Sequence, residues 1–554
     1  MLDGTAMTRR DLLLLIAIAI VPTALAQTIS APADARARVD KLFAIYNRTD
    51  SPGCAVGATI GATTVLSAGY GMADLEHNIP IAPESIFEAG SVSKQFTAAA
   101  VLLLAGQGKL SLDDPVRKYI PELPDYGQPL TIRHMMNHTS GLRDWGSVEA
   151  IAGWPRTTRV YTHAHVLEIV SRQRALNYPP GAEYSYSNTG FNLATMVVSR
   201  VSGKSFPEFT RDSIFSPLDM SSTQWRDDFQ RIVHNRAIAY TQSAGTVRTL
   251  MPFENVYGNG GLLTTVGDLL RWNQNFTVAK VGGRAFVTAQ QQQGKLNDGR
   301  TIAYAAGLMM LNWKGLPEVS HSGSTAGYRA WLGRYPNQGL SVAVLCNLAS
   351  ANATELGHRV AEVYLHSVIP PGANAPKIQS DTAALQSKVG LYSSARDHET
   401  ISVELSDGHL QLGRRGALQA VSNNIFTLGE DGSRAEFEND SSGKARRLRV
   451  ATEVDEGNYY DRIEPAKPTL ADLEAMAGEY VSDEAEVTLK AAVENGRLVI
   501  HRRPDTTIPL TPTYRDGFSS SLGSVRFIRN GGGRIVEMSI GEQRVWDLRL
   551  RRTS

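Results

Sequence analysis

The sequence predicts an α+β domain followed by two small antiparallel β-barrels, and three observations support this. Helix-like and strand-like segments alternate over residues 27–368. Residues 369–380 are rich in Pro, Gly and Ala and break every periodicity, as a linker does. Over 381–465 and 469–554 the helical pattern nearly vanishes, and short alternating strands between turn residues replace it.

The first domain begins and ends with predicted strand pairs. After a helix over 35–47, the segments 54–60 and 63–67 form a hairpin around a glycine turn. Near the other end, 328–335 and 340–345 form a second pair joined by a Pro-Asn-Gln-Gly turn. Strands at both ends with helices between them are typical of an α+β domain.

The last third of the chain contains an internal repeat. Four features recur 88 residues later: Leu385, Gly390, Tyr392 and Asp407-Gly408 return as Leu473, Gly478, Tyr480 and Asn495-Gly496. Asp-Gly and Asn-Gly followed by alternating residues are strong hairpin signals. Each copy, about 85 residues long, is sufficient for a closed barrel of roughly eight short strands.

Composition excludes several classes of partner. The chain has 554 residues with 56 basic against 55 acidic side chains, so no net field favours nucleic acid or an anionic membrane. No apolar stretch reaches the roughly 20 residues that a spanning helix needs. The two cysteines and the histidine spacings do not fit a metal site. We therefore expect no nucleic-acid partner, no integral membrane span, no metal and no cofactor.

Residues 1–26 are predicted to be a signal peptide. A basic pair, Arg9-Arg10, precedes an apolar stretch that ends before Pro22, and Ala24-Leu25-Ala26 has the small-x-small pattern of a cleavage site. We expect a periplasmic or secreted protein, and the arginine pair also matches a twin-arginine export signal.

Export bears on the two cysteines, Cys54 and Cys346. An oxidising compartment permits a disulfide between them. Folding in the cytosol before twin-arginine export would instead bury both thiols in the reduced form, and buried free cysteine is common in protein cores. Free thiols are the favoured alternative, and the pairing of the two cysteines stays open.

Ser91 and Lys94 form an S-x-x-K motif just before an apolar helical run, 96–104. Residues three apart on a first helical turn share a face, so Oγ and Nζ can meet. A desolvated, neutral lysine can take the serine proton, and the helix N-terminus can help hold an oxyanion. Ser441 and Lys444 repeat the motif in a polar turn, where nothing would desolvate the lysine.

Two further motifs carry chemistry. Tyr186 and Asn188 form Y-x-N; a phenol with a depressed pKa near a lysine can shuttle protons, and the amide can orient a substrate carbonyl. His321 and Gly323 form the only H-x-G in the chain, followed by Ser324. The glycine would let a substrate or the nucleophile approach the strand closely.

In this order the three motifs resemble those of the penicillin-recognising serine hydrolases, which include class C β-lactamases, D-alanyl-D-alanine carboxypeptidases, D-aminopeptidases and esterases. The resemblance covers about 34–366, with further matching stretches at 108–115, 137–142 and 260–265. It implies a β-lactamase-like catalytic domain, an antiparallel sheet with helices. The layout is closest to D-aminopeptidases, which also carry two antiparallel barrels, and is similar to peptidases that degrade linearised microcystin.

The resemblance also implies roles. Ser91 would be the acylated nucleophile, with Lys94 and Tyr186 sharing the acid and base work; which of them is the base stays open. Asn188 would bind a substrate amide. The backbone N–H groups of Ser91 and Ser324 would form the oxyanion hole.

His321 would line the opposite wall, and it departs from the pattern. β-Lactamases and carboxypeptidases of this family usually carry lysine there, where its charge helps hold the substrate carboxylate. Neutral imidazole does this poorly. The substitution resembles D-aminopeptidases and esterases, whose substrates need not present that carboxylate.

We therefore expect an exported serine peptidase acting on small peptides with D- or non-ribosomal residues, linearised microcystin among the candidates. A carboxylesterase, a β-lactamase or D-alanyl-D-alanine carboxypeptidase, and a non-catalytic penicillin-binding sensor are the alternatives. The resemblance suggests that the barrels restrict the cleft or support a homodimer, and that one of their loops could reach the active site.

Overall fold

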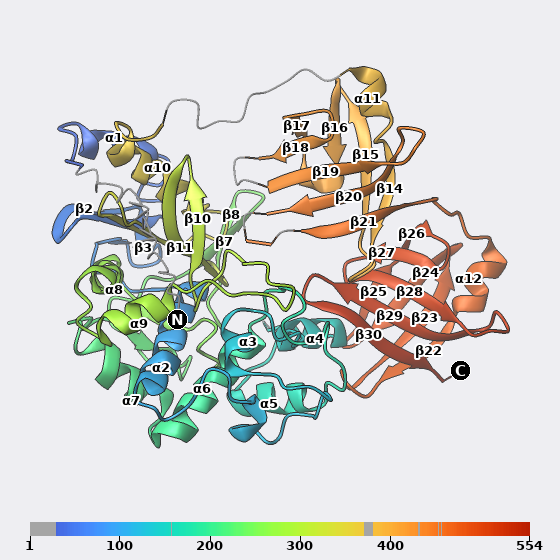
Figure 1. Cartoon of the computed structure of the whole chain (residues 1–554), viewed down its shortest axis with the longest axis horizontal. Helices are drawn as coiled ribbons and strands as arrows, with labels where there is room; N and C mark the ends of the chain where they lie inside the picture. The colour runs from blue at the N-terminus through green and yellow to red at the C-terminus, as the bar shows by residue number, and fades with distance from the viewer. Residues whose placement is uncertain are drawn as a thin grey trace, which may run out of the picture.

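The protein is described from a computed structural model over residues 29–156, 158–370, 381–429, 433–452, 454–455 and 457–553. The predicted signal peptide, 1–26, and most of the predicted linker, 369–380, lie outside the described residues. Figure 1 shows a mixed helix-and-strand body (blue to yellow) beside two strand-rich bodies (orange and red). The predicted fold class is confirmed.

A six-stranded antiparallel sheet forms the centre of the first body. Its order is β10 (Met309–Trp313), β11 (Leu316–Thr325), β12 (Tyr328–Tyr335), β13 (Leu340–Cys346), β1 (Cys54–Ile60) and β2 (Thr63–Tyr70). Both predicted hairpins are present, as β1–β2 and β12–β13. Because β1 pairs with β13, the two hairpins join into one sheet.

The pairing of β1 with β13 decides the open question of the two cysteines, against the favoured alternative of free thiols. Cys54 and Cys346 stand directly opposite each other in this register and form a disulfide. They are 292 residues apart in sequence, and no local pattern indicates which distant strand β1 pairs with. The sequence left the pairing open because the decisive contact is nonlocal.

Helices cover both faces of this sheet. Successive side chains of a strand point to opposite faces, and successive residues of β1 and β13 are buried, so both faces need a cover. On one face α1 (Ala35–Phe43) and α10 (Ala353–Leu365) pack together, in a core that includes Val56 of β1. The neighbouring Ala55 points the other way, into the larger core, and α8 (Val266–Val278) packs on β1 and β13.

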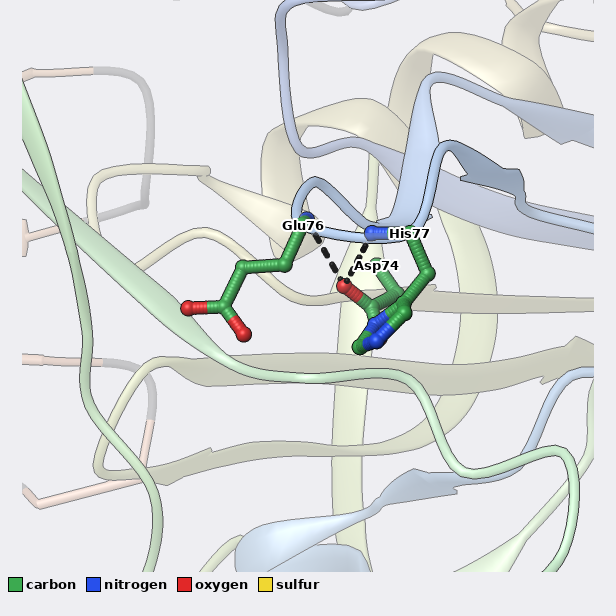
Figure 2. Close-up of side chains that lie close together, drawn as sticks. All are labelled: Asp74, Glu76 and His77. Carbon is green, nitrogen blue, oxygen red and sulfur yellow. Dashed lines mark hydrogen bonds and ion pairs between the residues drawn. The ribbon is translucent and has the colours of Figure 1, made fainter.

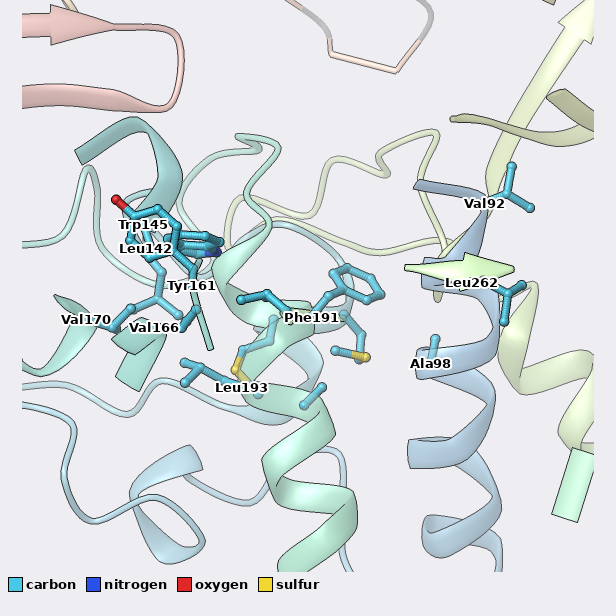
Figure 3. Close-up of a cluster of buried hydrophobic side chains, with 14 of the residues drawn as sticks. Val92, Ala98, Leu142, Trp145, Tyr161, Val166, Val170, Phe191, Leu193 and Leu262 are labelled. Atoms are coloured by element: carbon cyan, nitrogen blue, oxygen red, sulfur yellow. The ribbon is translucent and has the colours of Figure 1, made fainter. Parts of the chain in front are cut away.

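The larger core lies among the remaining helices of the first body. These are α2 (Lys94–Gly106), α3 (Ile132–Met136), α4 (Trp145–Ala152), α5 (His163–Ser171), α6 (Thr189–Ser202), α7 (Phe206–Thr210) and α9 (Gly283–Gln290). Figure 3 shows Phe191 and Leu193 of α6 between Ala98 of α2 and a group that includes Trp145. The helix α6 therefore fixes α2 relative to α4.

Short elements complete the first body. The strands are β3 (Met72–Asp74), β4 (Ile79–Pro80), β5 (Phe87–Glu88), β6 (Gln224–Trp225), β7 (Tyr240–Ser243), β8 (Thr246–Thr249) and β9 (Leu262–Thr264). The short helical turns are η1 (Gly90–Ser93), η2 (Val116–Lys118) and the π-helical η3 (Arg211–Phe215). The turn η1 leads directly into α2.

The second body is an eight-stranded antiparallel sheet that curls into a nearly closed barrel. Its elements are α11 (Thr382–Gln386), β14 (Gly390–Ser394), β15 (Thr400–Ser406), β16 (His409–Leu412), η4 (Gly413–Arg415), β17 (Leu418–Ala420), β18 (Ile425–Leu428), β19 (Ser433–Asn439), β20 (Ala445–Ala451) and β21 (Asn458–Ile463). A bridge between Gln411 and Ala417 connects its outermost strands.

The third body has nine strands in the same arrangement. Its elements are α12 (Leu470–Met476), β22 (Gly478–Ser482), β23 (Val487–Glu494), β24 (Arg497–Arg502), β25 (Thr506–Pro509), β26 (Thr511–Tyr514), β27 (Gly517–Ser520), β28 (Gly523–Arg529), β29 (Ile535–Glu542) and β30 (Val545–Arg552). No helix within the described ranges is long and apolar enough to cross a bilayer.

The internal repeat has a structural counterpart in both barrels. Tyr392 and Tyr480 are fully buried, and each hydroxyl donates to the carbonyl four residues earlier, at 2.7 Å. The repeated hairpin turns also match, since Asp407 and Asn495 both have φ near +50°, followed by glycine at positive φ.

The third body is bound tightly to the first. Gln173 Nε2 donates to the Glu484 carbonyl at 2.9 Å, and Arg503 Nε donates to the Ala152 carbonyl at 2.8 Å. Asn177 holds the turn between β29 and β30: its Nδ2 donates to the Arg544 carbonyl, and its Oδ1 accepts from Trp546 N. These contacts position Arg544 beside the first body.

Candidate active site

A cleft of about 570 Å³ brings the three sequence motifs together. Six of the predicted site residues line it: Ser91, Tyr186, Asn188, His321, Gly323 and Ser324. Lys94, the seventh, is fully buried and contacts Ser91 from within the protein. Residues separated by more than 200 positions in the sequence therefore form one site.

Lys94 is held by three oxygen atoms. Its Nζ lies 3.1 Å from Ser91 Oγ, 2.9 Å from Asn188 Oδ1 and 2.8 Å from the Asn259 carbonyl. Amide oxygens can only accept, so the two N–H bonds of a neutral amine satisfy them and the lone pair is left for the Ser91 hydroxyl. Burial, and then the charge of Arg544, hold the pKa of Lys94 well below its usual value.

Tyr186 lies on the other side of the serine. Its hydroxyl faces the Ser91 side chain, and its ring centroid is 4.7 Å from Lys94 Nζ. Burial raises the pKa of Tyr186 to about 12, so the phenol is not the depressed-pKa group that the sequence suggested. The difference arises from packing, because His138 covers the ring at a centroid distance of 4.2 Å.

Asn188 is fixed at both ends. Its backbone N–H donates to Asp144 Oδ2 at 2.7 Å, and its side-chain oxygen receives Lys94. Asp144 also caps α4 through the N–H groups of Gly146 and Ser147. His138 contacts backbone, because its Nδ1 accepts from Ser187 N.

His321 is buried and carries no charge. Burial, and then the charge of Lys94, lower the pKa of His321 to about 3. Its Nδ1 lies 2.6 Å from the Ser322 carbonyl, which can only accept, so this nitrogen bears the hydrogen. Nε2 then accepts from the Tyr304 hydroxyl at 3.0 Å. Both ring nitrogens are therefore occupied within the protein.

Two glycines let η1 and β11 come into contact. A Cβ on Gly323 would lie 2.0 Å from the Ala89 carbonyl oxygen and 3.1 Å from Ser91 N. A Cβ on Gly90, whose φ is +51°, would lie 2.5 Å from Ser324 N. The nucleophile turn thus approaches the β11 backbone closely, as the glycine of the H-x-G motif predicted, and the backbone N–H groups of Ser91 and Ser324 lie at this junction.

These pKa shifts predict a pH profile. Acylation of Ser91 by a fluorophosphonate should accelerate with rising pH as Lys94 loses its proton, and should level off well below pH 10.5. His321→Gln should keep the same midpoint, because His321 is already neutral above about pH 3. The measurement is the second-order inactivation rate against pH; a midpoint displaced by more than about one unit in the variant would contradict a neutral His321.

Sequence reasoning missed several residues of the cleft. Arg156 and Arg544 line it, and Arg544 lies on the third body, with its guanidinium carbon 5.1 Å from the Tyr186 ring centroid. Tyr304 orients His321. None of these residues belongs to a local motif. The expectation that a barrel loop could reach the active site was the one indication of Arg544.

A separate cluster lies on the β3–β4 turn, outside this cleft. Figure 2 shows Asp74, Glu76 and His77, whose candidate ligand atoms lie within 4.8 Å of one another. Asp74 Oδ1 accepts from the N–H groups of Glu76 and His77, and Oδ2 lies 2.8 Å from His77 Nδ1. Turn formation explains this arrangement, and we assign no metal to it.

The chain matches known proteins along most of its length. A family model described as Beta-lactamase matches residues 35–365. Penicillin-binding protein 4* of Bacillus subtilis is 28% identical over 68% of this chain and 90% of its own length. A D-aminopeptidase of Brucella melitensis biotype 2 is 24% identical over 90% of this chain and 95% of its own length.

A solved structure shares the fold. The D-amino acid amidase from Ochrobactrum anthropi SV3, complexed with L-phenylalanine amide, superimposes with a TM-score of 0.51 at 20% identity, over 60% of this chain and 99% of its own. The family model covers more than half of the chain and includes every motif of the cleft. This protein therefore belongs to the β-lactamase family and is a serine hydrolase.

Proposed function

We propose that this protein is an exported serine peptidase that hydrolyses small peptides through an acyl-enzyme on Ser91. The observation that carries the proposal is the contact of Ser91 Oγ with a buried lysine whose other two partners are amide oxygens. The similarity to a D-aminopeptidase favours peptides with D-residues. Non-ribosomal peptides, linearised microcystin among them, are candidates on the resemblance of the sequence motifs alone.

The mechanism follows from these contacts. Ser91 Oγ attacks the substrate carbonyl while its proton passes to neutral Lys94, the better base of the pair because Tyr186 stays protonated. The N–H groups of Ser91 and Ser324 hold the oxyanion. Collapse of the tetrahedral intermediate breaks the C–N bond. The amine leaves with the proton that Lys94 took up, passed on directly or through the Tyr186 hydroxyl, and an ester to Ser91 remains. Water then attacks this ester while neutral Lys94 accepts its proton, the bond between the acyl carbon and Ser91 Oγ breaks, and Lys94 returns the proton to Oγ.

Asn188 and His321 complete the proposed site. The Asn188 amide lines the cleft and can bind a substrate carbonyl through its NH₂ group. His321 acts as an uncharged wall beside Gly323, not as an acid or base, because both ring nitrogens are engaged.

Export is part of the proposal. The signal-peptide pattern over 1–26 supports it, and the Cys54–Cys346 disulfide fits an oxidising compartment. Expression of the full chain should deliver a periplasmic protein whose mass corresponds to a start at Gln27. The homodimer stays a prediction, and light scattering tests it by measuring the molar mass of the protein in solution.

Intact-mass spectrometry tests the nucleophile. After incubation with a fluorophosphonate or a penicillin, the wild type should gain one adduct and Ser91→Ala none. A wild type without an adduct would support the non-catalytic sensor, and the same adduct on both proteins would exclude Ser91.

A substrate panel tests the reaction class. D- and L-aminoacyl p-nitroanilides, p-nitrophenyl esters, a chromogenic cephalosporin and defined peptides should show amide hydrolysis with a preference for D-residues. Rapid cephalosporin turnover without peptide hydrolysis would favour a β-lactamase, and turnover of esters alone would favour a carboxylesterase.

A further inference from the structure

The charge of the cleft is one-sided. Among the described residues that line it, three are arginines, Arg156, Arg329 and Arg544, and none is aspartate or glutamate. His321 adds no charge, because it is neutral above about pH 3. A ligand in this cleft therefore meets cations without a counter-charge in the wall.

The charge of Arg156 is already compensated. Its Nε donates to Glu254 Oε2 at 2.7 Å, and Nη2 bonds the other carboxylate oxygen. Glu254 in turn lies 3.6 Å from the buried Arg226, which pairs with the buried Glu88. The charges of these two carboxylates and two guanidiniums cancel, so the four residues together contribute little net field to the cleft.

Arg329 is tied to backbone. On β12 it stands opposite Ser324, and its Nη1 donates to the carbonyls of Ala326 and Tyr328, at 2.8 and 2.7 Å. These bonds direct one guanidinium nitrogen into the β11–β12 turn, away from a ligand.

Among the described residues, Arg544 is held neither by a close ion pair nor by backbone carbonyls. Its closest carboxylate oxygen, Asp144 Oδ2, is 3.9 Å away and already accepts the Asn188 N–H at 2.7 Å. The guanidinium lies over the Tyr186 ring, beside the serine. Asn177 and Asp144 N hold this loop through the Arg544 backbone carbonyl, so the loop contacts do not depend on the side chain.

We propose that the cleft selects substrates that carry a carboxylate near the scissile bond, and that Arg544 binds this carboxylate. The proposal rests on the proposed function and names its substrate class. It revises the expectation, drawn from His321, that the substrate needs no carboxylate. A free α-ammonium group, the mark of an aminopeptidase substrate, would meet like charges and no acid in this cleft.

Matched ester donors test the proposal, because they acylate the serine whether or not amides are cleaved. Three p-nitrophenyl esters of D-alanine differ only at nitrogen: succinyl (negative), methoxysuccinyl (neutral) and unsubstituted (positive). Two further esters of acetyl-D-alanine differ only in the leaving group, 3-hydroxybenzoate or phenol. The first set places the carboxylate on the acyl side of the scissile ester bond, and the second set places it on the leaving group.

We expect a carboxylate on one side to raise kcat/KM about 10- to 100-fold over its neutral partner, the usual contribution of a charge-assisted contact. Arg544→Gln should remove this ratio, Arg544→Lys should restore part of it, and Arg551→Gln on the exposed surface of β30 should leave it intact. An effect of Arg544 on the pKa of Lys94 would change all donors alike and leave the ratio unchanged.

Three results would overturn the proposal. They are equal rates for charged and neutral donors, preference for the unsubstituted amine, and a ratio lost in Arg329→Gln but kept in Arg544→Gln. Failure of every donor together with no fluorophosphonate adduct would instead refute the proposed function itself.

Discussion

Lys94→Met should reduce the rate of Ser91 acylation by about 10³-fold, the range expected for loss of a general base. Methionine fills similar apolar space but cannot accept the proton, and Tyr186, with its pKa near 12, is too weakly ionised at neutral pH to replace it. The rate of fluorophosphonate adduct formation, followed by intact mass at several pH values, measures the effect. The pH-dependent rise should vanish with the lysine.

The chain offers a matched control for this substitution. Lys444 ends a second S-x-x-K sequence, but it lies in an exposed turn between β19 and β20. Lys444→Met should retain full activity because Lys444 is exposed and does not line the cleft. Activity of Lys94→Met within tenfold of the wild type would assign the base to another group.

Gly323→Ala should disrupt the site although it adds only one methyl group. The new Cβ would lie 2.0 Å from the Ala89 carbonyl oxygen, so η1 and β11 must move apart. Overpacking of this kind costs about 1 to 3 kcal/mol of the free energy of unfolding. A displacement of about 1 Å between Ser91 N and Ser324 N would lower kcat/KM about 100-fold.

Gly260→Ala is the control, because this glycine lines the same cleft but its Cβ would come no closer than 3.9 Å to the Gly90 carbonyl oxygen. Thermal unfolding and kcat/KM on one ester donor are the measurements. Equal loss of activity in both variants would show that the cleft tolerates no added methyl group, and would refute the specific η1–β11 contact.

The sequence predicts those features of the site that depend on residues close together in the chain. It misses those that depend on contacts between distant residues. Helical spacing alone places Ser91 next to Lys94, and the glycine of the H-x-G motif predicts the close approach of η1 to β11. The ionisation of Tyr186 was mispredicted because it depends on burial by His138, which spacing does not reveal.

Nonlocal features escaped prediction for the same reason. Arg544 reaches the cleft on a turn of the third body, and the Cys54–Cys346 pairing depends on which strand lies beside β1. The barrels were predictable because their repeat and their Asp-Gly and Asn-Gly turns are local signals.

The bond between Cys54 and Cys346 has a topological consequence. It joins β1, the first strand of the first body, to β13, the last strand in sequence of its central sheet, so residues 54–346 form a covalent ring. A protease that cuts one peptide bond inside this ring opens it without separating the halves. Both halves, and the barrels that follow Cys346, would still migrate as one species on a non-reducing gel and would separate only after the sulfurs are reduced.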